Sequence, residues 1–282
     1  MSSMPKTVGV IGGGRMGAGI AQVFAAGGAE VSVVETGDAS AARGRIADGL
    51  AKAAERGKLT DTPDGVLARV TVVDDVTALP ASARLVVEAV PEQPDLKVDV
   101  LTRAEKVLGE QAVLASNTSS LSISELGAVL QRPERFLGMH FFNPVPASEL
   151  VEVVTAPQTA SEVAEQVIGW VRGLGKTDVV VKDSPGFATS RLGVLLGLEA
   201  IRMLEEGVAD AEAIDNAMEL GYRHPMGPLR STDLVGLDVR LSIAEYLHST
   251  LGERFAPPRL LRDKVADGQL GRKTGQGFHS WG

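Results

Sequence analysis

The stretch KTVGVIGGGRMGAGIAQVFAAGGAEVSVVE, residues 6–35, decides the fold. Residues 6–11 form a short apolar run, as expected of a buried strand. The glycine-rich turn GGGRMG follows at residues 12–17, and the alanine-rich segment 18–27 then predicts a helix. Residues 30–35 alternate as a second strand and end in an acid. This order of strand, glycine turn, helix and strand predicts a βαβ unit at the start of an α/β domain.

Three glycines and one acid in this unit match the dinucleotide-binding fingerprint. Gly12 permits the tight turn, Gly14 lets a pyrophosphate approach the backbone, and Gly17 lets the helix pack on the strand. The N-terminus of the helix supplies N–H groups and a partial positive charge for the phosphates. Glu35 lies where a carboxylate can accept hydrogen bonds from the adenosine ribose, and its charge would repel a 2′-phosphate. The sequence therefore predicts NAD rather than NADP.

The chain downstream continues the α/β alternation and then changes character. Strand patterns recur at residues 69–73, 85–90, 112–116, 136–142, 150–154 and 177–181, and helix patterns at 38–58, 94–108 and 159–174. Beyond residue 183 only helices are predicted, over residues 187–206, 210–220, 238–251 and 258–266. Ser184 and Pro185 have the residue types of an N-cap and first turn for the first of these helices.

The predicted fold is therefore an N-terminal doubly wound, Rossmann-type α/β domain followed by an all-helical domain. We place an NAD-binding domain at residues 1–183 and a helical substrate-binding and dimerisation domain at residues 184–282. The apolar faces of the C-terminal helices are candidates for self-association.

Composition excludes several classes of function. The chain has 282 residues, a formal net charge of −8 and no cysteine. An acidic chain without a basic run is a poor partner for nucleic acid or an anionic membrane. The lack of cysteine removes disulfides, thiolate metal sites and cysteine nucleophiles together. No metal-ligand spacing, serine-hydrolase elbow, secretory signal or spanning helix is evident, so a cytoplasmic protein is expected.

One histidine of four stands out. His224 and His279 lie in polar, glycine-rich stretches that predict surface or loop positions, and His248 lies in a helical segment. His140, in contrast, ends an apolar strand pattern, and Glu152 lies in the apolar run that follows. A lone histidine would favour a structural role, but a carboxylate in an apolar run needs a partner when buried. A His–Glu pair would hold the imidazole tautomer and stabilise the imidazolium, as a base for alcohol oxidation requires.

Two polar segments complete the candidate site. Asn117 to Ser120 follow a strand at its C-terminal end, where open parallel sheets bind ligands. The helix predicted at residues 38–58 carries several cations, including Lys52 and Lys58. Such a helix face is most often simply solvated, although a phosphate-bearing ligand could meet these charges.

Motifs along the whole chain resemble the bacterial 3-hydroxyacyl-CoA dehydrogenases of the 3-hydroxybutyryl-CoA dehydrogenase type. They are GGGRMGAGIA (12–21), VVEAVPE (86–92), SNTSSLSI (116–123), GMHFFNPVP (138–146), LVEVV (150–154), DSPGFATSRL (183–192), HPMGPLRSTDLVGLD (224–238) and GRKTGQGF (271–278). No single motif is specific to this family, but all of them together, in the same order from end to end, are.

This resemblance implies a role for each matched residue. His140 is the catalytic acid/base, Glu152 its partner, and Ser119 the hydrogen-bond donor to the 3-oxygen of the substrate. Asn143 lies near the nicotinamide and the substrate, and Lys52 or Lys58 meets the CoA nucleotide. The implied cofactor-binding set is Gly12, Gly14, Met16, Gly17, Glu35, Ala89, Val90, Glu92, Lys97, Ser119, Asn143 and Lys273. A homodimer formed through the helical domain is also implied.

One position departs from the family pattern. The family has PGF-x-x-N-R, whereas residues 185–191 read PGFATSR, so that Ser190 occupies the position of a substrate-contacting and catalytic asparagine. Serine is shorter and offers one hydroxyl in place of an amide. The change predicts a shift in substrate preference.

We therefore predict a dehydrogenase that uses NAD to interconvert (S)-3-hydroxyacyl-CoA and 3-oxoacyl-CoA, with a short acyl chain such as 3-hydroxybutyryl. One alternative is an enzyme of the same plan that acts on 3-hydroxyadipyl-CoA or on a free hydroxy or sugar acid. An alternative from another class is a non-catalytic NAD-binding sensor, against which the His140–Glu152 pair argues.

Overall fold

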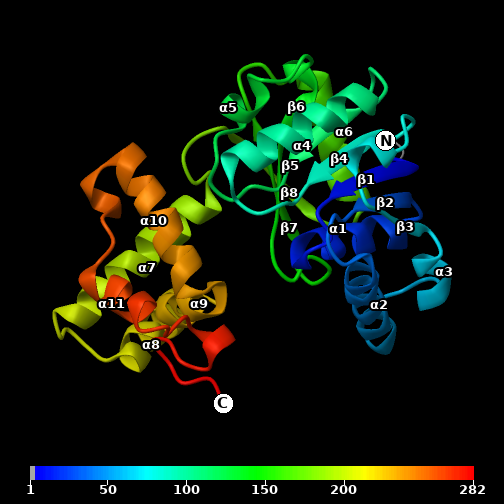
Figure 1. Ribbon diagram of the computed structural model, residues 1–282. Helices are drawn as coiled ribbons and strands as arrows, with labels where there is room; N and C mark the ends of the chain where they lie inside the picture. Colours follow the sequence, from blue (N-terminus) through cyan, green and yellow to red (C-terminus); the bar gives the residue numbers. More distant parts are fainter. Residues whose placement is uncertain (1–3) are drawn as a thin grey trace. The chain divides into compact units, whose positions relative to one another are not determined.

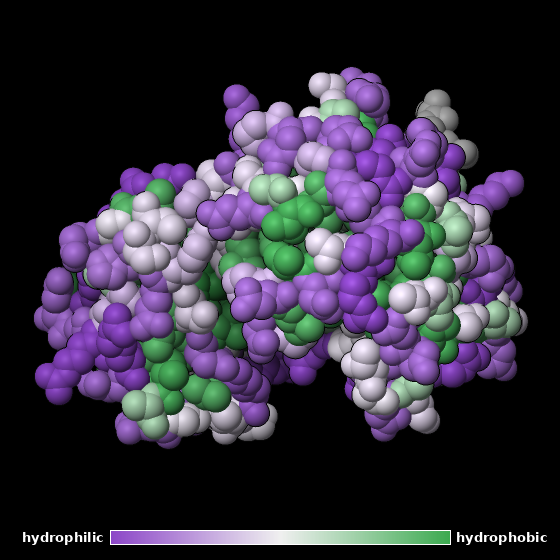
Figure 2. Space-filling model, turned by 45° about the horizontal axis from the view of Figure 1, so that its top comes forward, coloured by the Kyte–Doolittle hydropathy of each residue, from purple (hydrophilic) through white to green (hydrophobic). Residues whose placement is uncertain are grey.

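The computed structural model describes residues 4–282 and divides the chain into two compact units, one ending at Asp183 and the other running from Ser184 to Gly282 (Figure 1). Hydrophilic side chains cover most of the face shown in Figure 2, with hydrophobic groups between them. No helix among the described residues is long and apolar enough to cross a bilayer.

The first unit is built on one eight-stranded sheet of order β3-β2-β1-β4-β5-β6-β7-β8. The strands are β1 (Thr7–Ile11), β2 (Glu30–Val34), β3 (Val70–Val73), β4 (Leu85–Glu88), β5 (Val113–Ser116), β6 (Phe136–Phe141), β7 (Leu150–Thr155) and β8 (Thr177–Lys182). The helices are α1 (Arg15–Ala26), α2 (Ala39–Glu55), α3 (Pro63–Leu67), α4 (Pro94–Val107), α5 (Ile123–Gly127) and α6 (Ser161–Gly173). The predicted Rossmann-type α/β fold is confirmed.

The direction of the strands changes once. β3, β2, β1, β4, β5 and β6 pair in parallel, whereas β6 and β7 are antiparallel, and β8 is again parallel to β7. Residues directly opposite in an antiparallel pair project side chains to the same face of the sheet. His140 pairs in register with Glu152, so the reversal at β6–β7 places these two side chains next to each other.

The central strands of the sheet are buried because their sequences are continuous apolar runs. Central strands of a doubly wound sheet are covered on both faces, so their residues need not alternate in polarity. All four residues of β4 and of β5 are buried. Phe24 from α1 and Trp170 from α6 are the bulkiest side chains of this core, each exposed by no more than 2%.

The second unit is built of helices, apart from two isolated β-bridges in its tail, and has its own core. Its helices are α7 (Thr189–Glu205), α8 (Ala211–Tyr222), α9 (Pro228–Val235), α10 (Leu237–Leu251) and α11 (Arg259–Ala266). All five helices contribute to one buried cluster, whose members include Leu198, Ile201, Ile214, Leu229, Leu247 and Leu261.

The predicted start of α7 was wrong. Ser184 and Pro185 do not open the helix, which begins at Thr189 after the N-cap residue Ala188. Gly186 and Phe187 adopt positive φ angles of 75° and 50°, which a right-handed helix cannot contain. The short helix α9 was not predicted. Its first residue, Pro228, has the fixed φ that suits the first helical position.

Candidate active site

The glycine turn between β1 and α1 has the geometry that a dinucleotide requires. Gly12 has a φ of 104°, and a Cβ there would lie 2.8 Å from the carbonyl oxygen of Ala89. A Cβ on Gly17 would lie only 1.8 Å from the carbonyl oxygen of Gly12, so α1 can approach β1 only without that side chain. A Cβ on Gly14 would meet no atom within 4 Å. The space beside Gly14 is therefore open, as pyrophosphate binding needs.

Glu35 ends β2 beside this turn. Its Oε2 accepts a hydrogen bond from the backbone N–H of Gly13 at 3.1 Å, and its Oε1 accepts one from Gly37 at 2.9 Å. These bonds hold the carboxylate at the rim of a cavity of about 590 Å³. The predicted residues that line this cavity are Gly12, Gly14, Met16, Glu35, Ala89 and Val90. Six of the predicted cofactor residues thus surround one cavity, and the turn fits NAD.

His140 and Glu152 form the hydrogen-bonded pair that the sequence predicts. His140 Nδ1 lies 2.8 Å from Glu152 Oε2, and the two residues are 5% and 0% exposed. An ionised carboxylate only accepts hydrogen bonds, so Nδ1 carries the proton and the transferable proton belongs to Nε2. The ring of Phe142 packs on the imidazole, with 4.4 Å between ring centroids. The pair is therefore buried and fixed in orientation.

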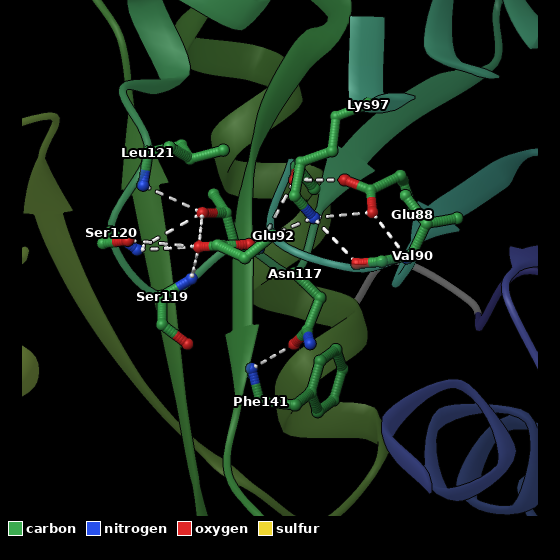
Figure 3. A network of polar contacts seen from close by, with 11 residues as sticks. Glu88, Val90, Glu92, Lys97, Asn117, Ser119, Ser120, Leu121 and Phe141 are labelled. Atoms are coloured by element: carbon green, nitrogen blue, oxygen red, sulfur yellow. Dashed lines mark hydrogen bonds and ion pairs between the residues drawn. The ribbon is translucent and has the colours of Figure 1, made fainter. Parts of the chain in front are cut away.

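The end of β5 is tied to the same strand. Asn117 Oδ1 accepts a hydrogen bond from the backbone N–H of Phe141 at 2.8 Å, as Figure 3 shows. Phe141 follows His140 directly, so this bond holds the polar turn after β5 beside the histidine. Ser119 lies in that turn, and in Figure 3 its hydroxyl points away from the contacts that the turn makes.

A buried ionic network underlies the turn (Figure 3). Lys97 on α4 is 1% exposed, and its Nζ lies 2.7 Å from Glu88 Oε1 and 3.2 Å from Glu92 Oε2. Glu88 is 0% exposed and also accepts hydrogen bonds from Ser116 and from the N–H of Val90. Burial raises the pKa of Glu88, although Lys97 and these donors stabilise its charged form.

Glu92 connects this network to the turn. Its Oε1 accepts hydrogen bonds from the Thr118 hydroxyl, from the backbone N–H of Ser119 at 3.0 Å and from that of Ser120 at 3.2 Å. Burial acts to raise the pKa of Glu92, but the charge of Lys97 and the bonds from the turn outweigh it, so the pKa lies below its ordinary value. Glu92 and Lys97 thus position Ser119.

The sequence did not reveal the roles of Glu88, Ser116 and Thr118. Glu88 ends an apolar strand, and this position could have indicated a buried acid that needs a partner. Lys97 lies in a helix that looks amphipathic, and nothing in its sequence context showed that its ammonium group turns inward.

Glu92 predicts a pH-dependent stability. Its folded-state pKa lies below the ordinary value of 4.5, so its contribution is present above pH 4.5 and is lost as the pH falls through the folded-state pKa. Glu92→Gln should therefore lower the melting temperature at pH 7, with a gap from the wild type that narrows below pH 4.5. Thermal unfolding between pH 7 and pH 3.5 measures this gap, and a gap that is constant with pH would contradict the assignment.

A second cavity of about 390 Å³ lies between α1, α2 and the loop after β6. Asn143 and Pro144, joined by a cis peptide bond, form part of its wall. Its cationic lining residues are Arg15, Arg45, Lys52, Arg56 and Lys58. Both lysines predicted to bind CoA and Asn143 thus border one cavity. The sequence could not show this, because the match to the family motifs is loose in α2.

Ser190, Lys273 and His279 belong to the second unit. Ser190 is half-buried in the first turn of α7. Lys273 forms an ion pair with Asp238, with Nζ–O distances of 2.5 and 2.6 Å. His279 lies in a bend outside any helix or strand, in agreement with the predicted surface or loop position. Its side chain is only 12% exposed, because its Nε2 lies 2.8 Å from Asp215 Oδ2 of α8.

The glycine turn, the acid at the end of β2 and the His–Glu pair on one sheet are the features of an NAD-dependent dehydrogenase. Residues 7–184 match the NAD binding domain of 3-hydroxyacyl-CoA dehydrogenase, and residues 186–281 match the C-terminal domain of that enzyme. The chain belongs to the 3-hydroxyacyl-CoA dehydrogenase family.

Relatives of known name resemble the chain over its full length. The 3-hydroxybutyryl-CoA dehydrogenase of Mycobacterium tuberculosis is 42% identical and covers 100% of both chains. The human mitochondrial hydroxyacyl-coenzyme A dehydrogenase is 40% identical over 98% of this chain and 91% of its own. The crystal structure of (S)-3-hydroxybutyryl-CoA dehydrogenase PaaH1 from Ralstonia eutropha superposes with a TM-score of 0.92, 40% identity and 99% coverage of both chains.

Proposed function

We propose that the protein interconverts (S)-3-hydroxybutyryl-CoA and its 3-oxo product with NAD, and that His140 is the general acid/base. The 2.8 Å contact between His140 Nδ1 and Glu152 is the observation that carries this proposal. It gives a buried imidazole a fixed tautomer and a partner for its positive form. The names of the relatives support the short acyl chain.

The residues of the chain divide the work of the reaction. In oxidation, His140 takes the proton of the 3-hydroxyl through Nε2, and in reduction it returns that proton. Glu152 holds the ring through Nδ1 and stabilises the imidazolium. Ser119, positioned by Glu92, donates a hydrogen bond to the 3-oxygen. When bound, NAD accepts the hydride that leaves C3.

Formation of NADH tests the proposal directly. The enzyme should reduce NAD with (S)-3-hydroxybutyryl-CoA and should have little activity with the free acid 3-hydroxybutyrate. Activity with the free acid but not with its thioester would favour a hydroxy-acid dehydrogenase. Tight NADH binding without turnover of any hydroxyacyl-CoA would favour a sensor.

The cationic cavity between α1 and α2 is our proposed site for the CoA nucleotide. Lys52, Arg56 and Lys58 line it together, and the 3′-phosphate and pyrophosphate of CoA are anions of the matching charge. The cavity also includes Asn143, three residues beyond His140. A thioester bound there would therefore enter the active site from this side.

Removing two of these cations should weaken acyl-CoA binding. In the Lys52→Gln/Lys58→Gln variant we expect KM for 3-hydroxybutyryl-CoA to rise roughly 10-fold, because exposed ion pairs contribute up to about 1 kcal/mol each. KM for NAD should change little, since its cavity lies on the other side of the glycine turn. Lys106→Gln, an exposed lysine in the last turn of α4, is the matched control. An equal rise in both KM values would contradict the placement of CoA.

Two further expectations stay proposals. We infer a homodimer through the helical unit, which has exposed apolar side chains including Leu192, Leu195, Leu234, Val235 and Val239. A cytoplasmic location also stays a prediction of the sequence. Sedimentation of the purified protein would test the dimer.

A further inference from the structure

Lys176 is a buried lysine whose hydrogen-bond partners are two backbone carbonyl groups. It is 8% exposed, and its ammonium group donates to the carbonyl oxygens of Val145 at 2.7 Å and of Ser148 at 2.5 Å. Burial lowers the pKa of Lys176, and the charge of Glu149 acts in the opposite direction. A buried charge is costly unless it is paired or hydrogen-bonded. An apolar side chain would avoid this cost, so the bonds to the two carbonyl groups indicate what the lysine contributes.

These bonds join two segments that are distant in the sequence. Lys176 lies in the turn between α6 and β8, and its acceptors lie 31 and 28 residues earlier, in the loop of residues 142–149 between β6 and β7. β7 and β8 are neighbours in the sheet, with Leu150 opposite Thr177. Lys176 therefore comes just before a strand that starts beside the end of this β6–β7 loop.

The β6–β7 loop has few other bonds to its surroundings. Its own turn is closed by backbone N–H groups that donate to the carbonyl oxygen of Pro144. Within the described part of the chain, hydrogen bonds from outside reach residues 143–148 at two places only. They are the pair from Lys176 and one from the adjoining N–H of Leu150 to the Ser148 hydroxyl. Lys176 is thus the distant anchor of the loop.

The same loop packs closely on α1. Val145 is its one buried residue after Phe142, exposed by 2%. A Cβ on Gly19 of α1 would lie 2.9 Å from the Cβ of Val145, so the helix admits the valine only because position 19 is a glycine. Lys176 holds the carbonyl group of this valine. The lysine therefore fixes the backbone at the point where the loop meets α1.

The anchored residues form a wall of the cationic cavity. Residues 143–147 line it together with residues of α1 and α2, including Lys52 and Lys58. Lys176 does not line the cavity, because its ammonium group is turned to the loop backbone. It can therefore affect a ligand in the cavity only through the place of this wall.

We propose that Lys176 is a positioning residue for acyl-CoA, which holds residues 143–147 where the cavity needs them and so sets the affinity for the thioester but not that for NAD. The cavity at the glycine turn includes no residue of the β6–β7 loop. Without its anchor the loop would populate other conformations, and the affinity would fall with the fraction of molecules that keep the binding conformation. This inference rests on the proposed function, because it takes acyl-CoA as the ligand of the cationic cavity.

Lys176→Met tests the inference, because methionine keeps a long apolar stem and lacks the donor. KM for (S)-3-hydroxybutyryl-CoA should rise roughly 10-fold, and KM for NAD should stay within about two-fold. Lys176→Arg, which retains donors, should recover part of the affinity. Lys176→Gln is a shorter donor and should also raise KM for the thioester, so the test does not depend on the stability of the methionine variant. Lys182→Met, which removes an exposed lysine at the other end of β8, should change neither KM.

Two measurements without turnover separate this inference from the proposed function. In ligand-free Lys176→Met the amides of Ala147 and Ser148 should exchange hydrogen faster than in the wild type. By calorimetry, CoA should bind this variant roughly 10-fold more weakly, whether or not any substrate is oxidised. Unchanged exchange, unchanged affinity for CoA, or an equal loss of affinity for NAD would overturn the inference. Oxidation of 3-hydroxybutyryl-CoA by the wild type would still support the proposed function in that case.

Discussion

Replacing His140 with asparagine should lower kcat for oxidation of (S)-3-hydroxybutyryl-CoA by roughly 10³-fold. General acid–base catalysis contributes about 10²- to 10⁴-fold, and asparagine cannot accept the proton of the hydroxyl. The KM for NAD should change little, because the cavity at the glycine turn does not include His140. Steady-state formation of NADH at saturating NAD measures both quantities.

His248→Asn is the matched control for this substitution. His248 lies in α10, its side chain is 36% exposed, and its Nε2 lies 3.1 Å from the exposed Glu253 carboxylate, so its replacement should leave kcat within about two-fold. If His140→Asn retained more than about 1% of the wild-type kcat, the loss would fall below the low end for a general base. His140 would then be a structural residue.

Alanine substitutions at two glycines of the turn should have different effects, one on stability and the other on NAD binding. In Gly17→Ala the new Cβ would lie 1.8 Å from the carbonyl oxygen of Gly12, so β1 and α1 must separate. We expect the free energy of unfolding of this variant to fall by several kcal/mol and its melting temperature to fall by roughly 10 °C. In Gly14→Ala the Cβ meets no atom within 4 Å and φ is −66°, so the fold should keep its melting temperature. The same Cβ would fill the space that we assign to the pyrophosphate, so NAD affinity should fall at least about 10-fold.

Calorimetry of NAD binding and thermal unfolding of the two variants check this contrast. Gly28→Ala is not a suitable control, because its φ of 91° strains any side chain. Gly44→Ala in α2 is suitable, since a Cβ there also meets no atom within 4 Å and the residue lies inside a helix. Normal NAD affinity in a stable Gly14→Ala variant would mean that the pyrophosphate does not approach this glycine.

The parts of the site that follow from local sequence were predictable. The glycine turn and Glu35 belong to one βαβ unit, whose geometry is set by residues close in the chain. The His140–Glu152 pair was predictable because both residues lie in apolar strands that are short and neighbouring. Their antiparallel register was not predictable, because the sequence between β6 and β7 does not show whether β7 runs parallel or antiparallel to β6.

The parts that depend on packing between distant elements were not predictable. Lys97 turns inward because Glu88 on β4 and Glu92 after it provide two carboxylates, and no spacing in the sequence shows this. The start of α7 was misplaced because Gly186 and Phe187 adopt positive φ angles, which the proline before them does not reveal.

A double-mutant cycle of His140 and Glu152 tests the central claim most directly. Rates of a single turnover of NADH formation from (S)-3-hydroxybutyryl-CoA should be measured for the wild type, His140→Asn, Glu152→Gln and the double variant. If Glu152 acts only through His140, the double variant should be no slower than His140→Asn. Losses that multiply, with Glu152→Gln lowering the rate by the same factor whether or not His140 is present, would contradict the account.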